Sequence, residues 1–169
     1  MEVRSIEAII RALNDADVRY LIAGGVAVVA HGYVRFTADL DLILDLSADN
    51  LRRAVPALES LGYRPLVPVT FESFIDADTR AGWIRDKGLT VFSLHSPAHP
   101  ATVIDLFVDE PLDFAKSYAS AVRMEVASGL SATVVNLEDL FALKKQASRP
   151  KDMMDMERLR AIQKERAGE

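Results

Sequence analysis

The stretch AGGVAVVAHGYVRFTADLDLIL, residues 23–44, decides the fold of this chain, because it joins a Gly24-Gly25 turn to the pair Asp39 and Asp41. Side chains alternate between the faces of a strand, so Asp39 and Asp41 point the same way, with Cα atoms roughly 7 Å apart. Aspartate is a poor strand former, and two like charges on one face repel unless a cation lies between them. A glycine turn that opens a helix brings backbone N–H groups close to a phosphate. These features favour a metal-dependent enzyme that acts on a nucleotide.

The length and composition limit the classes to which this protein can belong. The 169 residues are enough for one domain with a substantial core, and 50% hydrophobic with 27% charged residues is ordinary for a globular protein. The net charge of −5 argues against broad non-specific binding of nucleic acid. Cysteine is absent from the sequence, which excludes disulfides, thiolate catalysis and cysteine-based zinc sites.

The sequence also predicts a location. The N-terminal residues 1–7 are charged and lack the apolar run of a signal peptide. No stretch approaches the roughly 18 consecutive apolar residues that a membrane span needs. We therefore expect a cytoplasmic protein with no membrane association. No feature of the sequence indicates its oligomeric state.

Hydrophobic periodicity and turn residues predict one mixed α/β (α+β) domain over residues 1–169, with a mixed sheet and helices over 1–135 and helices over 136–169. We expect helices over 5–14, 26–31, 51–61, 137–147 and 151–165, and strands over 18–23, 38–46, 89–94, 102–108, 121–126 and 131–135. Pro56 is expected to kink the third helix or delay its start. Residues 63–88 are the least regular part, with one helix expected within 71–85, and three methionines of the last helix (Met153, Met154, Met156) are expected to pack inside.

A third acid lies in the strand Val103-Ile104-Asp105-Leu106-Phe107, where apolar residues flank Asp105 on both sides. If this strand lies beside the strand of Asp39 and Asp41, three carboxylates converge. Such a set of oxygen donors suits Mg²⁺ or Mn²⁺, and two such ions stabilise an in-line displacement at phosphorus. Asp105, at the acceptor side, could then serve as general base. The alternative is that the alternation marks an ordinary half-exposed strand and that Asp105 is a salt-bridge partner.

These motifs together resemble the DNA polymerase beta-type nucleotidyltransferase superfamily. That family has a glycine followed by Gly or Ser, then about nine to thirteen residues, an Asp-x-Asp or Asp-x-Glu, and a third acid on a later strand. Gly24 and Gly25 match the first element, Asp39 and Asp41 the second, and Asp105 the third. The fold implied is a short mixed sheet that carries the three acids, with a helical C-terminal portion.

Residues 23–41 and 143–152 are further similar to small bacterial stand-alone members, a group that includes the abortive-infection-type nucleotidyltransferase toxins. The resemblance implies transfer of a nucleoside monophosphate from an NTP to an acceptor, with release of pyrophosphate. Asp39, Asp41 and Asp105 would hold two Mg²⁺ ions, with Mn²⁺ as the substitute. The acceptor is left open between tRNA, a protein and a small molecule, and the toxin-like group implies an antitoxin partner.

Basic side chains are expected at the triphosphate, because Gly25 stands where some family members carry a serine that helps to hold it. Lys144 falls within the apolar stripe of the helix over 137–147, from which it either snorkels to solvent or reaches the phosphates. Arg35 and Thr37, before the acidic strand, and Arg149 and Lys151, after the helix, complete the predicted nucleotide-binding set with Gly24 and Gly25.

Two other function classes compete with the transferase. One is a non-catalytic module that keeps the fold for binding or regulation, for example within a toxin–antitoxin pair. The complete set of three acids argues against it. The other is a metal-dependent phosphohydrolase, which the glycine turn and the scarcity of metal-binding histidines make less favourable.

Overall fold

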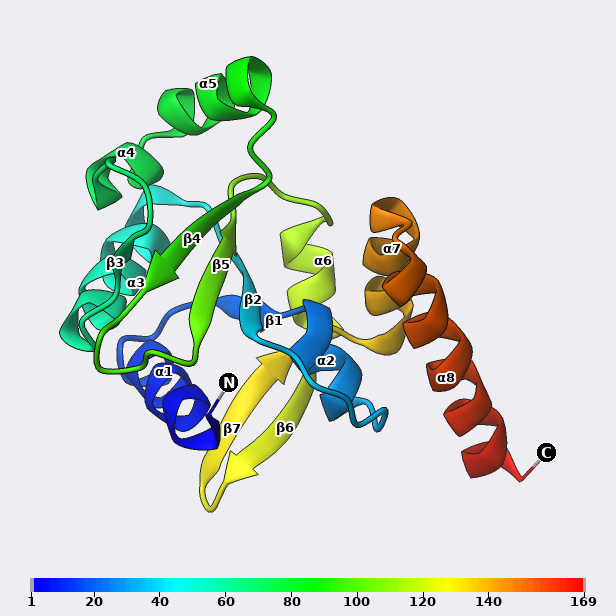
Figure 1. Cartoon of the computed structure of the whole chain (residues 1–169). Coiled ribbons are helices and arrows are strands. Elements are labelled where there is room, and N and C mark those ends of the chain that lie inside the picture. Colours follow the sequence, from blue (N-terminus) through cyan, green and yellow to red (C-terminus); the bar gives the residue numbers. More distant parts are fainter. Residues whose placement is uncertain (1, 169) are drawn as a thin grey trace.

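The sheet of this protein forms around the two strands that carry the predicted acids. The computed structural model describes residues 2–168 (Figure 1). The strands are β1 (Tyr20–Ile22), β2 (Asp39–Leu44), β3 (Arg64–Pro65), β4 (Val91–His95), β5 (Val103–Phe107), β6 (Val122–Ala127) and β7 (Leu130–Val134). The helices are α1 (Val3–Asp15), α2 (Gly24–Ala30), α3 (Ala48–Ser60), α4 (Phe71–Ile75), α5 (Ala77–Lys87), α6 (Phe114–Ala119), α7 (Leu137–Ala147) and α8 (Pro150–Ala167).

The seven strands form one mixed sheet in the order β3-β4-β5-β2-β1-β7-β6. The central strands β2 and β5 run parallel, while β1 runs antiparallel to β2 and parallel to β7. In the β2–β5 register, Asp41 lies opposite Asp105. The predicted mixed sheet is therefore confirmed, and so is the predicted neighbourhood of the two acidic strands.

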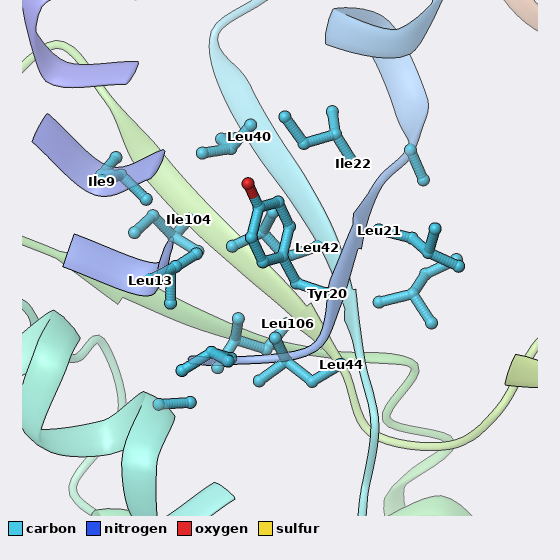
Figure 2. Close-up of a cluster of buried hydrophobic side chains, with 14 of the residues drawn as sticks. Ile9, Leu13, Tyr20, Leu21, Ile22, Leu40, Leu42, Leu44, Ile104 and Leu106 are labelled. Atoms are coloured by element: carbon cyan, nitrogen blue, oxygen red, sulfur yellow. The ribbon is translucent and has the colours of Figure 1, made fainter. Parts of the chain in front are cut away.

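Burial of the leucine face of β2 fixes this register. Leu40 and Leu42 are fully buried, as is Ile104 of β5, and Figure 2 shows them on the side of the sheet where Ile9 and Leu13 of α1 lie. A slip of one residue would turn every side chain of the strand to the other face. That slip would put the aspartates into the hydrocarbon core, so burial of the leucines holds the acids on the opposite face.

The two C-terminal helices pack against each other, and α2 packs against α7 (Figure 1). Asn136 caps α7 as predicted, since its side chain accepts a hydrogen bond from the Asp139 N–H at 2.7 Å. Pro150, which ends the link after α7, becomes the first residue of α8, where its fixed φ suits a helix start. Among residues 2–168, none of the helices combines the length and the apolar character needed to cross a bilayer.

Several details differ from the sequence prediction, among them the unpredicted two-residue strand β3. Pro56 lies inside α3, whose start at Ala48 is not delayed, because Pro56 is on the exposed side, where water can satisfy the carbonyl that loses its partner. The single helix expected within 71–85 is two helices, because the Asp76 side chain caps α5 by accepting from the Thr79 N–H. The six-residue α6 was not predicted, because it is too short to show a period. Met153 and Met154 are more than half exposed, so the prediction that they pack inside is wrong.

Candidate active site

The glycine turn lies directly against the acidic strand. Gly24 has a φ of +58°, in the left-handed region, and a Cβ atom at this position would lie 1.8 Å from the Oδ2 atom of Asp41. A Cβ atom on Gly25 would lie 2.3 Å from the Oγ1 atom of Thr37. The Ala23 N–H donates to the Asp41 carbonyl at 2.9 Å, which fixes the turn against β2. The close approach of the two segments therefore requires glycine at both positions.

The carboxylates of β2 and β5 lie in a desolvated, like-charged environment. Burial, followed by the charges of Asp105 and Asp39, raises the pKa of Asp41 to about 6, although a backbone hydrogen bond from Gly25 opposes the shift. Burial also raises the pKa of Asp105, against a hydrogen bond from the Ser93 hydroxyl on β4. Ser93 is a contact of the site that the sequence did not predict.

The donor set fits a hard divalent cation in charge and in chemistry. Carboxylate oxygens are the ligands that Mg²⁺ and Mn²⁺ prefer, and a bound cation would offset the burial and the like-charge repulsion that together raise the pKa of Asp41. Within residues 2–168, no group of three or more His, Cys, Asp or Glu side chains stands close enough together to coordinate an ion without rearrangement. The fit therefore rests on charge and donor type.

A cavity of about 550 Å³ lies over these carboxylates. All ten residues that the sequence predicted for the site contribute to its lining, namely Gly24, Gly25, Arg35, Thr37, Asp39, Asp41, Asp105, Lys144, Arg149 and Lys151. They come from the glycine turn, the loop before β2, the two central strands, the end of α7 and the start of α8 with the link between them. The roles of these residues stay predictions, whereas their common location is a property of the fold.

Most of the cations at this cavity already have anionic partners. Lys144 is 4% exposed, so the first of its two alternatives, that it snorkels to solvent, is wrong. Its Nζ atom lies 2.9 Å from Oδ1 of Asp152 and 2.8 Å from Oδ2 of Asp155. The Nε atom of Arg149 lies 2.7 Å from Oδ2 of Asp152, and that of Arg35 lies 2.7 Å from Oδ1 of Asp155.

Asp152 and Asp155 of α8 are ionised members of this network. Burial disfavours the charge of Asp152, but hydrogen bonds from Arg149 and Lys144 outweigh it and lower its pKa to about 2. Burial likewise opposes ionisation of Asp155, and hydrogen bonds from Arg35 and Lys144 lower its pKa. The sequence prediction did not include either acid in the site. Their three-residue spacing, which puts both on one face of a helix with Leu159, is the signal that could have found them.

The raised pKa of Asp41 predicts that its contribution to the stability of the metal-free protein falls as the pH rises from about 4 to about 7. Between the ordinary value of 3.8 and the value of about 6 in the fold, the folded protein binds more protons than the unfolded chain. The Asp41 contribution lost across this window is roughly 2–3 kcal/mol, at about 1.4 kcal/mol per pKa unit.

Urea titrations in EDTA at pH 4 to 8 check this expectation on the parent and on Asp41→Asn. The difference between their free energies of unfolding should change by the stated amount across the window. A difference that stays constant with pH would contradict a buried, like-charged Asp41.

Among known proteins, the chain matches solved structures but no family model and no curated sequence. Solved structures do match: the crystal structure of ANT(2'')-Ia in complex with adenylyl-2''-tobramycin superposes with a TM-score of 0.57 at 18% identity, over 93% of this chain and 86% of that one.

A second match is the solution structure of the antibiotic-resistance factor ANT(2'')-Ia, with a TM-score of 0.54 at 17% identity, over 98% of this chain and 92% of that one. At such identities the likeness concerns the fold. This chain therefore shares the fold of ANT(2'')-Ia, a mixed sheet with helices, and the fold class that the motif resemblance implied is confirmed.

Proposed function

We propose that this protein is a metal-dependent nucleotidyltransferase, which moves a nucleoside monophosphate from an NTP to an acceptor hydroxyl and releases pyrophosphate. The observation that carries the proposal is the meeting of three carboxylates with a glycine turn in one cavity. Asp39, Asp41 and Asp105 line it together with the Gly24-Gly25 turn, which lies against Asp41, and basic residues line it as well. Neither a non-catalytic module nor a metal-dependent phosphohydrolase requires this combination of carboxylates, glycine turn and basic residues.

The phosphate end of the cavity is assigned to the glycine turn and the basic residues around it. Gly24 and Gly25 let the backbone approach the β- and γ-phosphates without side chains in between. Arg149, whose side chain is 58% exposed, and Lys151, which lines the same cavity, offer positive charge at the mouth. Lys144 lies deeper, and two of its three N–H groups already bind carboxylates.

The proposed transfer needs only the NTP and the acceptor as reactants. The acceptor oxygen forms a bond to the α-phosphorus, the bond from the α-phosphorus to the bridging oxygen breaks, and pyrophosphate leaves. Asp105 accepts the acceptor hydroxyl proton, a role that its raised pKa suits, and Ser93 orients its carboxylate. Asp39, Asp41 and Asp105 would hold Mg²⁺ or Mn²⁺, which when bound supplies positive charge to the phosphates.

For the acceptor we propose a small hydroxyl compound that carries positive charge. Asp109 lines the cavity near Thr90 and Phe107, and no ion pair to Asp109 is found among residues 2–168. The net charge of −5 disfavours a polyanionic acceptor such as tRNA. The structural neighbour ANT(2'')-Ia, in complex with adenylyl-2''-tobramycin, supports the same class.

Pyrophosphate release tests both parts of this proposal. Each of the four NTPs is incubated with Mg²⁺ or with EDTA, and with tobramycin, total tRNA or a mixture of folded proteins. We expect Mg²⁺-dependent pyrophosphate release with the cationic acceptor. Release with tRNA or protein alone would keep the transferase and overturn the acceptor class. Release of inorganic phosphate from phosphate esters would favour the phosphohydrolase, and no turnover would favour the non-catalytic module. The antitoxin partner stays a prediction from the resemblance.

A further inference from the structure

Asp155 connects the last helix to the loop before the acidic strand. Its side chain is almost fully buried, although it belongs to α8, and its carboxylate receives a two-pronged ion pair from Arg35. The Nε atom of Arg35 donates to Oδ1 at 2.7 Å and Nη2 donates to Oδ2 at 2.8 Å. The same Oδ2 atom accepts from Nζ of Lys144 at 2.8 Å. One buried carboxylate therefore holds two of the cations that line the cavity.

The ion pairs leave both cations with donors to spare. Arg35 has five N–H groups, of which two bind Asp155 and one binds the Phe36 carbonyl at 2.9 Å. Lys144 has three, of which one binds Asp152 and one binds Asp155. The network of Arg35, Lys144, Arg149, Asp152 and Asp155 holds one more cation than anions. It can thus still attract an anion, while its carboxylates fix where the cations point.

Arg35 lies next to the glycine turn, so its ion pair with Asp155 is located at the proposed phosphate site. A Cβ atom on Gly25 would lie 3.3 Å from Nη1 of Arg35, so the guanidinium lies against the turn assigned to the phosphates. Residues 34 and 36, on either side of Arg35, are among the most exposed apolar residues of the protein. The loop is thus anchored through the side chain of Arg35 rather than through its apolar neighbours.

We propose that Asp155 is a positioning residue of the nucleotide site, which acts through Arg35 and Lys144 and makes α8 part of that site. The inference deepens the proposed function and rests on it. A long cationic side chain that is held in one geometry before the ligand arrives loses less freedom on binding. Asp155 provides this order from a helix 120 residues away in the chain.

Calorimetric titration with each Mg²⁺-NTP tests the proposal on five proteins. These are the parent, Asp155→Asn, Arg35→Met, the double variant, and Glu157→Gln as the matched control. Glu157 is an exposed carboxylate on the same helix. Each single change at the pair should weaken NTP binding about tenfold or more, while Glu157→Gln should not change it. The double variant should lose less affinity than the two single losses multiplied together, because part of the effect of Asp155 passes through Arg35 and the rest through Lys144. Independent, multiplying effects would overturn the proposal.

A second measurement separates this proposal from the proposed function. Hydrogen exchange of the amides in residues 33–39 is followed without nucleotide in the parent, Asp155→Asn and Glu157→Gln. Faster exchange in Asp155→Asn alone supports the positioning role, even if the parent binds no NTP and the proposed function fails. Unchanged exchange overturns it. If Asp155→Asn does not fold, Asp155→Glu keeps the charge but displaces the guanidinium, and parent-like exchange and NTP affinity in that variant would overturn the proposal.

Discussion

The Asp41→Asn variant should lose nucleotidyl transfer by about a thousandfold, because it removes a carboxylate of the set that would hold the metal ions on the phosphates. The same variant should be more stable than the parent in EDTA at pH 8. At that pH the parent carries an ionised Asp41 in a buried, like-charged position, with a pKa of about 6. Asparagine keeps the shape of the side chain and removes that charge. A gain in stability together with a loss of activity is the result expected for a functional carboxylate. Substitution of a structural ion-pair partner would lower both stability and activity.

Pyrophosphate release and thermal unfolding check the two halves of this prediction. Asp49→Asn is the control for the loss of a negative charge, because the Asp49 side chain is 87% exposed. Its activity and stability should stay close to those of the parent. Mg²⁺ should raise the melting temperature of the parent more than that of Asp41→Asn. Parent-like turnover by Asp41→Asn, or equal Mg²⁺ stabilisation of the two proteins, would contradict the assignment of Asp41.

The sequence was sufficient to predict the acidic half of the site because strand geometry is local. Alternation puts Asp39 and Asp41 on one face, and burial of the leucines of β2 fixes which face that is. That Asp105 lies opposite Asp41 needed one further step, the parallel pairing of β2 with β5. The glycine turn was predicted from its position between an apolar strand and a helix.

The cationic half could not be predicted in the same way. An acid in the first turn of a helix, as Asp152 is, ordinarily stabilises the helix by its interaction with the helix dipole. The neighbouring residues in the sequence do not distinguish that role from a buried ion pair. The contact of Asp155 with Arg35 depends on how α8 packs against the loop before β2, which is a tertiary property. Lys144 gave a local signal of its own, a charge on an apolar helix face, but the two carboxylates that pair with it belong to the second helix.

Gly24→Ala should be the most damaging small change to the turn. An alanine there would adopt a left-handed conformation, at about 1–2 kcal/mol, and its Cβ atom would overlap the Asp41 carboxylate at 1.8 Å. Relief of the overlap requires movement of β2 or of the turn, so we expect a total loss of roughly 2–5 kcal/mol in the free energy of unfolding. NTP binding should be lost as well, because the turn and the acids move apart.

Gly88→Ala is the matched control, since Gly88 has a φ of +60° and its Cβ atom would meet nothing within 4 Å. Urea titration should show only the backbone contribution of about 1–2 kcal/mol for Gly88→Ala, and the difference between the variants measures the overlap with Asp41. The double variant Gly24→Ala/Asp41→Ala should recover part of that difference, because it removes the Asp41 carboxyl atoms at 1.8 and 2.5 Å and leaves only the Cβ atom at 2.9 Å. Equal losses for the two glycine variants would mean that the turn does not press against Asp41, and the assignment of the turn and the acids to one site would then lose its basis.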